Sequence, residues 1–345
     1  MKSQNYNLFW QRLHKSAKNK SKLLRVMFEL TYRCNFHCRH CYIPLKYRKQ
    51  KELKTQDIFS ILDQLAKMGC FYLGFTGGEP FLRKDIMEIL WYAKKKGFEI
   101  IVYTNGSLIN KKLAKELSKL RPNKIDITIP AITKPAFERI TELPNSKNKV
   151  FKAIHLLHKA GVNLGFKTCA LKENKNEIKN IQKFAASLGA LHRLDDLLSR
   201  RLDGSGEPYK HRQNLFKNLL GEKFDTNLRQ YNDANLSPNT CLFKCGVGVN
   251  QAAITPQGKL KMCVMIDHLK YKADILPPSD LNQAWKKLKL LVASIKTDQN
   301  YKCNKCELRV FCKWCPAKAW LYNKNFTSCE PESRKKAELM KTTKL

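Results

Sequence analysis

Three cysteines stand close together near the start of the chain, at Cys34, Cys38 and Cys41 in the segment CNFHCRHC. A structural zinc ion takes four ligands, so a zinc site here would need a fourth ligand from elsewhere in the fold. A cubane iron–sulfur cluster can instead be held by three thiolates, which leaves one iron free to bind another molecule. The spacing favours a cluster with an open iron and leaves a structural metal site as the alternative.

The segment TGGEP, residues 76–80, is the second candidate for chemistry. Gly77 and Gly78 would let the backbone come close to a ligand, and the carboxylate of Glu79 could accept hydrogen bonds from an ammonium group. Pro80 ends the segment. On its own the segment would be a tight turn with a solvent-facing glutamate, so its position in the fold must decide between the two interpretations.

Eight further cysteines fall in the last third of the chain. Eight thiolates suffice for two zinc sites or for two four-thiolate iron–sulfur clusters, and their number does not separate these possibilities. The chain has 13 cysteines and no apolar signal segment at its start, so we expect metal or redox chemistry in the cytoplasm rather than disulfides. The eight cysteines are Cys241, Cys245, Cys263, Cys303, Cys306, Cys312, Cys315 and Cys329.

The elements that must position these residues follow a regular alternation. Helical periodicity fills the intervals between short apolar runs, and in residues 55–69 the side chains of Ile58, Ile61 and Leu65 share one face. The pattern predicts an α/β fold of parallel βα units that close into a full or partial (β/α)6 barrel of TIM type. Chemistry in such barrels lies at the carboxyl ends of the strands, so the cysteine loop and GGEP should be neighbours. The predicted strands are residues 26–32, 71–76, 98–104, 124–129, 162–170 and 191–196.

Composition divides the chain further. We expect a basic N-terminal tail over residues 1–25, the barrel over 26–200 and a connecting segment over 201–240. A smaller cysteine-rich iron–sulfur domain should then occupy residues 241–330, followed by a basic tail over 331–345. No run is apolar enough for a membrane span.

The cysteine loop after the first strand and GGEP after the second resemble the radical SAM superfamily. The resemblance implies that Cys34, Cys38 and Cys41 ligate a [4Fe–4S] cluster whose open iron chelates S-adenosylmethionine. It also implies that the segment Gly77–Pro80 holds the methionine end of that cofactor. His40 occupies the place where the family often has an aromatic ring beside the adenine.

Residues 124–160 resemble the fourth strand and following helix of peptide-modifying members. By position, Thr128 would meet the ribose and Arg139 would support the bound cofactor, although Pro130 and Ala131 replace the pair that often follows the strand. Asn105, in the TNG segment after the third strand, is a further cofactor-binding candidate, with a turn residue as its alternative.

The order of the C-terminal cysteines resembles the SPASM extension of radical SAM enzymes, which carries two auxiliary [4Fe–4S] clusters. One departure is the two-residue gap between Cys312 and Cys315, where three residues are commoner. The resemblance implies a first cluster held by Cys241, Cys245, Cys263 and Cys315, and a second held by Cys303, Cys306, Cys312 and Cys329.

Two cysteines stand outside these sets. Cys70 opens a predicted buried strand and is explained as a small core residue. Cys169 ends the fifth predicted strand near the barrel mouth. It either packs there or donates a hydrogen atom to a substrate radical, as an epimerase would require.

The resemblance implies reductive cleavage of S-adenosylmethionine to a 5′-deoxyadenosyl radical that takes hydrogen from a substrate. A ribosomally made peptide is the first candidate substrate, with crosslinking or epimerisation as the result. Maturation of a cofactor, a small molecule or a sulfatase-like protein is the alternative. Expected partners are a reductant such as ferredoxin or flavodoxin and a separate protein that recognises a leader peptide.

The net charge of +36 is spread along the whole chain. It is consistent with a lysine-rich proteome or with an acidic partner such as an acidic peptide. A zinc-stabilised nucleic-acid-binding protein is the most distant interpretation of the charge and the C-x2-C pairs.

Overall fold

The computed structural model describes residues 22–212, 242–243, 245–277, 279–297 and 301–342. Across these residues one sheet runs through the molecule in the strand order β6-β5-β4-β3-β2-β1-β7-β8-β9. The strands are β1 (Arg25–Thr31), β2 (Tyr72–Gly77), β3 (Glu99–Thr104), β4 (Lys124–Thr128), β5 (Leu164–Cys169), β6 (Leu191–Asp195), β7 (Gln251–Ile254), β8 (Lys259–Lys261) and β9 (Lys272–Asp274).

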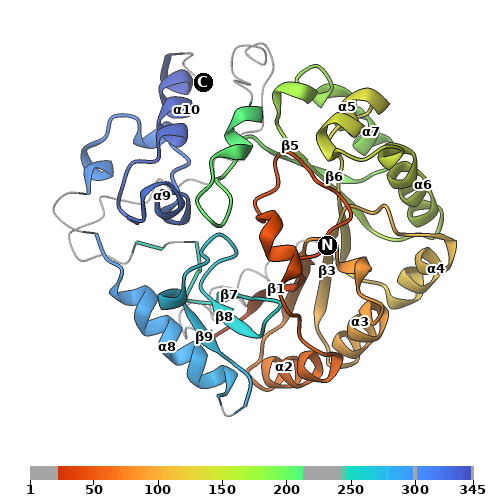
Figure 1. Ribbon diagram of the computed structural model, residues 1–345, viewed down its shortest axis with the longest axis horizontal. Coiled ribbons are helices and arrows are strands. Elements are labelled where there is room, and N and C mark those ends of the chain that lie inside the picture. Colours follow the sequence, from red (N-terminus) through yellow and green to blue (C-terminus); the bar gives the residue numbers. More distant parts are fainter. Residues whose placement is uncertain (1–21, 213–241, 244, 278, 298–300, 343–345) are drawn as a thin grey trace, which may run out of the picture.

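The first six strands confirm the predicted parallel barrel. Each of β1 to β5 pairs in parallel with the next strand along the chain, because a helix or loop crossover returns the backbone to the same end of the sheet. Helices line the outside of the curved sheet (Figure 1). The sheet stays open between β6 and β9, so the barrel is partial.

The helices follow the sequence pattern because each has one apolar stripe. In α2, Ile58, Ile61, Leu62 and Leu65 are buried against the sheet, on the predicted face. The helices are α2 (Thr55–Lys67), α3 (Ile86–Lys95), α4 (Lys111–Leu120), α5 (Lys134–Thr141), α6 (Ser146–Lys159), α7 (Ile178–Ser187), α8 (Leu281–Ser294), α9 (Pro316–Asn323) and α10 (Pro331–Thr342). None of the described helices is long and apolar enough to cross a membrane.

The sheet crosses the predicted boundary at residue 241. β7 pairs in parallel with β1, and β8 and β9 extend the sheet in antiparallel fashion. These strands contain four, three and three residues, which is too short for a periodic signal in the sequence. The cysteine-rich region is therefore joined to the barrel through its first strand.

The predicted basic tail over 331–345 is wrong for residues 331–342, which form α10. Ala337 and Met340 are buried, and the buried Lys336 pairs with Asp196 just after β6. The high content of charged residues concealed this packed face in the sequence. At the other end, Leu23 and Leu24 are buried before β1, within the segment predicted as a tail. Most of that segment, residues 1–21, and most of the predicted connecting segment, residues 213–240, lie outside the described residues.

Candidate functional site

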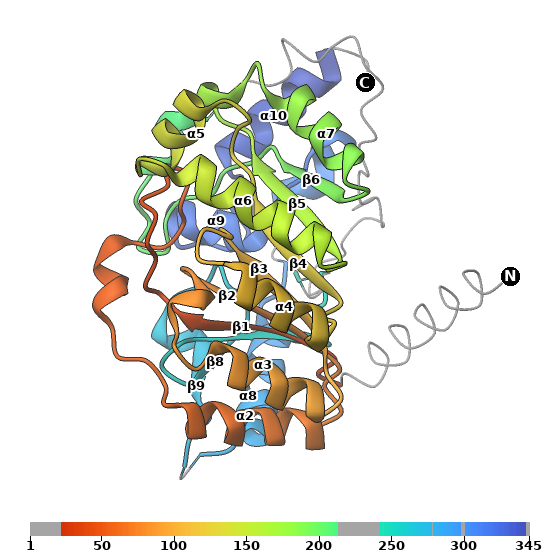
Figure 2. The ribbon, with the colours of Figure 1, turned by 90° about the vertical axis from the view of Figure 1, so that its right-hand side faces the viewer.

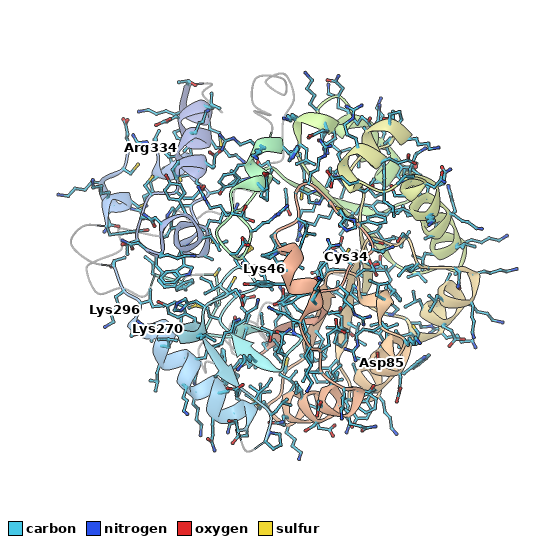
Figure 3. All side chains as sticks on the ribbon, in the orientation of Figure 1. Cys34, Lys46, Asp85, Lys270, Lys296 and Arg334 are labelled. Carbon is cyan, nitrogen blue, oxygen red and sulfur yellow. The ribbon has the colours of Figure 1, made fainter. Side chains whose placement is uncertain are left out.

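The loop of Cys34, Cys38 and Cys41 leaves the carboxyl end of β1 and is held from two sides. Arg48 donates hydrogen bonds to the carbonyl oxygens of Cys34 (3.0 Å) and Phe36 (2.7 Å). The backbone N–H groups of His37 and Arg39 donate to carbonyl oxygens at the end of α5, both at 3.0 Å. Figure 3 shows Cys34 near the middle of the molecule. The loop is thus fixed by its neighbours rather than by its own short sequence.

The three thiols of this loop lie in one another's electrostatic field. Burial raises the pKa of Cys34 to about 11 and also raises the pKa values of Cys38 and Cys41. The neighbouring sulfurs add to the rise for Cys38, which interacts with both other thiols. Three partly buried thiols in proximity ionise together only beside a strong positive charge. Their chemistry therefore fits a metal cluster, whose iron would supply that charge.

The GGEP segment lies directly against this loop. The N–H of Gly78 donates to the carbonyl of Thr31, and the N–H of Glu79 donates to that of Arg33, both at 2.8 Å. Gly77 has φ of +128°, and a Cβ at either glycine would overlap backbone atoms of Thr31 or Arg33. The glycines therefore allow close approach to the chain that enters the cysteine loop. Their expected contact with a cofactor remains a prediction.

Glu79 is completely buried and accepts three hydrogen bonds. Its Oε1 accepts from the Phe81 N–H (3.0 Å) and the Thr104 hydroxyl (2.7 Å), and its Oε2 accepts from the Asn105 N–H (2.7 Å). Burial raises the pKa of Glu79 to about 7, although these hydrogen bonds act in the opposite direction. The solvent-facing glutamate of a simple turn is excluded. A cation beside this carboxylate would favour its ionised form.

Asn105 connects the GGEP segment to the cysteine loop. Its side-chain N–H donates to Asn35 (2.9 Å), and its oxygen accepts from the backbone and hydroxyl of Ser107. Asn35 donates in turn to the Ser107 hydroxyl at 2.9 Å. The structure thus brings Asn105 into the site, and it adds Asn35 and Ser107, which the sequence analysis missed.

The other predicted cofactor residues lie at different depths. His40 is half-buried, its Nδ1 has no hydrogen-bond partner in the described structure, and burial lowers its pKa to about 4, so the ring is neutral at pH 7. Thr128 is half-buried at the end of β4. Arg139 is exposed on α5. The roles of all three toward a cofactor remain predictions.

Cys169 lies at the carboxyl end of β5, within electrostatic range of Cys38 and Cys41. Lys167 of the same strand forms an ion pair with Asp195 of β6 at 2.8 Å. Burial raises the pKa of Cys169 to about 12, so it carries its proton at neutral pH. An intact S–H bond is what a hydrogen-atom donor requires. Cys70, by contrast, is buried in the core, as its place in the sequence indicated.

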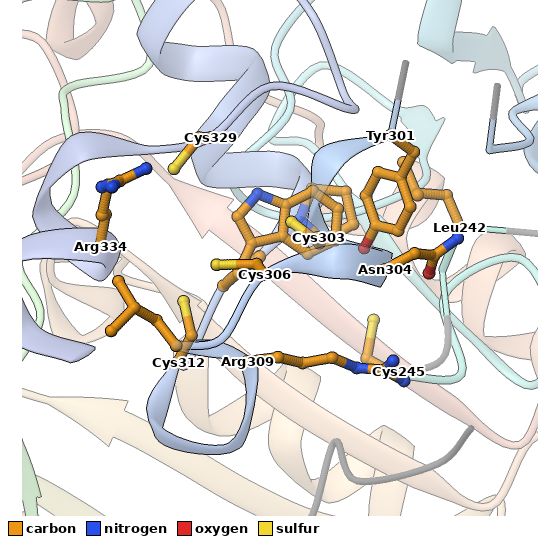
Figure 4. A pocket seen from close by; sticks show the side chains of 14 residues that line it. Leu242, Cys245, Tyr301, Cys303, Asn304, Cys306, Arg309, Cys312, Cys329 and Arg334 are labelled. Atoms are coloured by element: carbon orange, nitrogen blue, oxygen red, sulfur yellow. The ribbon is translucent and has the colours of Figure 1, made fainter. Parts of the chain in front are cut away.

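The C-terminal cysteines fall into two neighbourhoods. Cys263 interacts electrostatically with Cys315 and Cys245. Cys303, Cys306, Cys312 and Cys329 interact among themselves. Figure 4 shows cysteines of both neighbourhoods around one pocket, with Cys306, Cys312 and Cys329 at one side and Cys245 at the other. The grouping agrees with the predicted ligand sets, but Cys241 lies outside the described residues, and the ligand assignment remains a prediction.

The distances between the cysteine side chains can be compared with those that a zinc site requires. A tetrahedral zinc ion with Zn–S bonds of about 2.3 Å draws its sulfurs to within about 4 Å of each other. In the part of the chain that the structure describes, no three His, Cys, Asp or Glu side chains are grouped to hold a single metal ion. Whether these cysteines hold zinc ions or iron–sulfur clusters therefore remains a prediction at this point.

A groove of about 500 Å³ lies at the other end of the sheet, where α2 ends and α8 begins. Its wall includes the exposed side chains of Lys22, Lys67 and Lys286, and Trp285 contributes an apolar surface. Among the described residues that line it, none is acidic. These are Lys22, Leu23, Gln64, Lys67, Met68, Asn282, Trp285, Lys286 and Lys289.

Some residues of the site carried no usable signal in the sequence. Arg48 stands in the basic run KYRKQK, where nothing distinguishes it from its neighbours. Glu29 and Lys261 lie far apart along the chain yet form a completely buried ion pair. An acidic residue inside the apolar run VMFELTY was the one available hint, because a charge in a buried strand needs a partner.

A family model described as the radical SAM superfamily matches residues 28–185. Fe-coproporphyrin III synthase of Methanosarcina barkeri is 29% identical over 47% of this chain and 41% of its own length. PqqA peptide cyclase of Granulibacter bethesdensis is 29% identical over 48% of this chain and 44% of its own length. The matched segment thus spans less than half the length of these two relatives. Mycofactocin maturase MftC of Mycolicibacterium smegmatis is 27% identical over 75% of this chain and 69% of its length.

Solved structures share the fold at low identity. SuiB of Streptococcus suis bound to S-adenosylmethionine has a TM-score of 0.64 and 16% identity, covering 92% of this chain and 79% of SuiB. The enzyme anSMEcpe with bound AdoMet has a TM-score of 0.60 and 16% identity, covering 93% of this chain and 99% of its own. At this identity the likeness establishes the partial-barrel architecture of the chain.

Proposed function

We propose, from the match of residues 28–185 to the radical SAM superfamily model, that the protein reductively cleaves S-adenosylmethionine and abstracts a hydrogen atom from a peptide substrate. When bound, a [4Fe–4S] cluster would supply the electron for reductive cleavage of S-adenosylmethionine, and the resulting radical chemistry would remove a hydrogen atom from the substrate. Cys34, Cys38 and Cys41 would hold the cluster. A low-potential one-electron donor such as ferredoxin or flavodoxin would supply the electron.

One observation carries the proposal: the cysteine loop and GGEP form a single hydrogen-bonded unit at the carboxyl end of the sheet. Glu79 accepts a hydrogen bond from the Asn105 N–H, Asn105 donates to Asn35, and Asn35 directly follows Cys34 in the sequence. A cofactor bound to the open iron would meet the GGEP segment with no intervening element. In this arrangement the GGEP segment would orient a cofactor that is bound beside the cysteine loop.

The peptide substrate is supported by relatives and structural neighbours. PqqA peptide cyclase and mycofactocin maturase MftC are among the relatives, and solved structures include SuiB bound to precursor peptide SuiA and anSMEcpe with the Cp18Cys peptide. A separate leader-recognition protein remains part of this proposal.

A tetrapyrrole or another small molecule is the second candidate substrate. Fe-coproporphyrin III synthase and AdoMet-dependent heme synthases are also among the relatives, at 25–29% identity. Each of these matches covers about half of this chain and less than half of the relative. They therefore support cleavage of S-adenosylmethionine as the shared first step. The substrate must be identified by experiment.

The test begins with protein purified without oxygen. We expect about twelve irons per chain, as three four-iron clusters require, and formation of 5′-deoxyadenosine after reduction and addition of S-adenosylmethionine. A Cys34→Ala/Cys38→Ala/Cys41→Ala variant should keep about eight irons and form no deoxyadenosine. Zinc in place of iron in the native protein would contradict the proposal and favour the nucleic-acid-binding interpretation.

A further inference from the structure

Two opposite charges are completely buried between β1 and β8. Glu29 and Lys261 have side chains with 0% exposure, and the Glu29 Oε2 lies 2.7 Å from the Lys261 Nζ. Burying a charge costs several kcal/mol, and a well-packed apolar pair of similar size often folds as well or better. Stability alone therefore does not account for this pair, so its other contacts become informative.

The contacts of Glu29 reach both ends of the Cys34–Cys41 loop. The Tyr32 hydroxyl donates to Oε2 at 3.1 Å, and the Tyr42 hydroxyl donates to Oε1 at 3.2 Å. Tyr32 stands two residues before Cys34, and Tyr42 directly follows Cys41. One carboxylate thus holds the chain where it enters the loop and where it leaves.

Lys261 extends the same network to the other cysteine neighbourhood. Its Nζ also donates to the carbonyl of Val264 at 3.2 Å, and Val264 directly follows Cys263. Tyr42 interacts electrostatically with both Cys41 and Cys263. The network therefore ends beside one cysteine of each of two predicted metal sets, Cys41 of the first loop and Cys263 of the first auxiliary set.

The sheet register explains how two distant strands share one ion pair. Met27 of β1 pairs with Ala253 of β7, and Ala253 pairs with Lys261 of β8. Residues in register point to the same face of a sheet, and Glu29 is on the face of Met27 because it is two residues along the strand. Ala253 presents only a methyl group between them, so the longer side chains can meet over β7.

We propose that Glu29, Tyr32, Tyr42 and Lys261 form a positioning bridge that fixes the Cys34–Cys41 loop relative to the Cys263 loop and couples the two metal groups. This inference rests on the proposed function, because it takes the two cysteine neighbourhoods as ligands of separate clusters. The four residues bind no substrate; they act by holding the loops and by placing two charges between them. A change at one end of the bridge should therefore be detected at the other end.

The experiment uses reconstituted holoenzyme and reads each change at the far cluster. The cluster of Cys34, Cys38 and Cys41 is identified as the one whose electron paramagnetic resonance signal responds to added S-adenosylmethionine. The cluster at Cys263 is identified by the signal lost in Cys263→Ala. We expect Lys261→Met to shift the signal and midpoint potential of the first cluster, and Tyr42→Phe to shift those of the second.

Two controls match these substitutions. Tyr92→Phe removes a tyrosine–carboxylate hydrogen bond to Asp63 between α2 and α3, and Lys124→Met removes a half-buried lysine from its pair with Asp126 at the start of β4. Both should leave the two cluster signals as in the native protein. Circular dichroism establishes that each variant is folded. If Lys261→Met does not fold, Glu29→Gln/Lys261→Met removes both charges together and takes its place.

The inference is overturned if folded Lys261→Met and Tyr42→Phe change neither far signal, or if the controls change them equally. Native protein without four-iron clusters would instead refute the proposed function. Native protein with normal clusters, whose signals do not respond to the bridge variants, would refute the bridge alone.

Discussion

Glu79 illustrates how burial changes the pKa of a residue in a sequence motif. Its carboxylate is completely buried, and its pKa of about 7 lies above the value of an exposed glutamate. A raised folded-state pKa means that the folded protein binds more protons than the unfolded chain between about pH 4.5 and pH 7. The stability that Glu79 contributes is therefore complete below about pH 4.5 and is lost as the pH rises through about 7.

We expect Glu79→Gln to remove this pH dependence from the metal-free protein. The free energy of unfolding of the native chain should fall by about 3 kcal/mol between the two pH limits. This figure follows because a shift of one pKa unit corresponds to about 1.36 kcal/mol. The variant should also lose the binding of S-adenosylmethionine in the holoenzyme. Urea unfolding at several pH values measures the slope, and Glu99→Gln at the start of β3 is the control. An unchanged slope would mean that the Glu79 carboxylate is ionised throughout.

Cys169 is the second prediction at the residue scale. Its thiol keeps its proton at neutral pH and lies near the cysteine loop, so it can donate a hydrogen atom where a substrate radical would form. We expect Cys169→Ala to form 5′-deoxyadenosine but to stop deuterium uptake into the peptide in heavy water. Mass spectrometry of the peptide provides the measurement, with Cys70→Ala as the buried control. An unchanged peptide product would assign Cys169 to packing.

At the scale of elements, the sequence predicted the strands and helices that have a continuous hydrophobic pattern. Six strands were found from short, mostly apolar runs of five or more residues that alternate with helical segments, and α2 was found from its buried face. β7 to β9 were missed because they are short, and α10 was missed because its buried positions include Ser333 and Lys336. The motifs located the cysteine loop and GGEP. The Glu29–Lys261 pair could not be predicted, since it depends on which distant strands become neighbours.

The helix α10 gives a prediction at this scale. The Cys312 thiol lies 3.7 Å from the carbonyl of Ser333, and Arg334 lines the cysteine pocket. Glu330 also accepts hydrogen bonds from the backbone and hydroxyl of Ser333, which fixes the start of the helix. Deletion of residues 331–345 should therefore lower the iron content by about four atoms, the content of one cluster.

The control for that deletion removes residues 343–345 alone and should keep full iron content. Iron and sulfide analysis of both proteins makes the measurement. Full iron content after the longer deletion would restore the interpretation of these residues as a basic tail.

At the scale of the whole molecule, the net charge of +36 raises the question of which surface could bind an acidic partner. The proposed catalytic end of the sheet pairs several of its cations, including Lys167 with Asp195 and Arg39 with Glu142. The described lining of the groove between α2 and α8 contains four lysines and no acidic residue. A net positive groove with an apolar floor suits an acidic peptide better than it suits a neutral one.

Substitutions of Lys286 and Lys287 can distinguish binding of an acidic peptide in the groove from a general effect of the net charge. Both are exposed neighbours on α8, but Lys286 lines the groove and Lys287 does not. We expect Lys286→Glu to weaken binding of a glutamate-rich peptide roughly three- to tenfold, as reversal of one exposed charge pair allows, and Lys287→Glu to have little effect. Fluorescence anisotropy at low and high salt measures both, and the difference should shrink as salt screens the charges. Equal weakening by the two variants would show that the peptide responds to the charge of the molecule as a whole rather than to the groove.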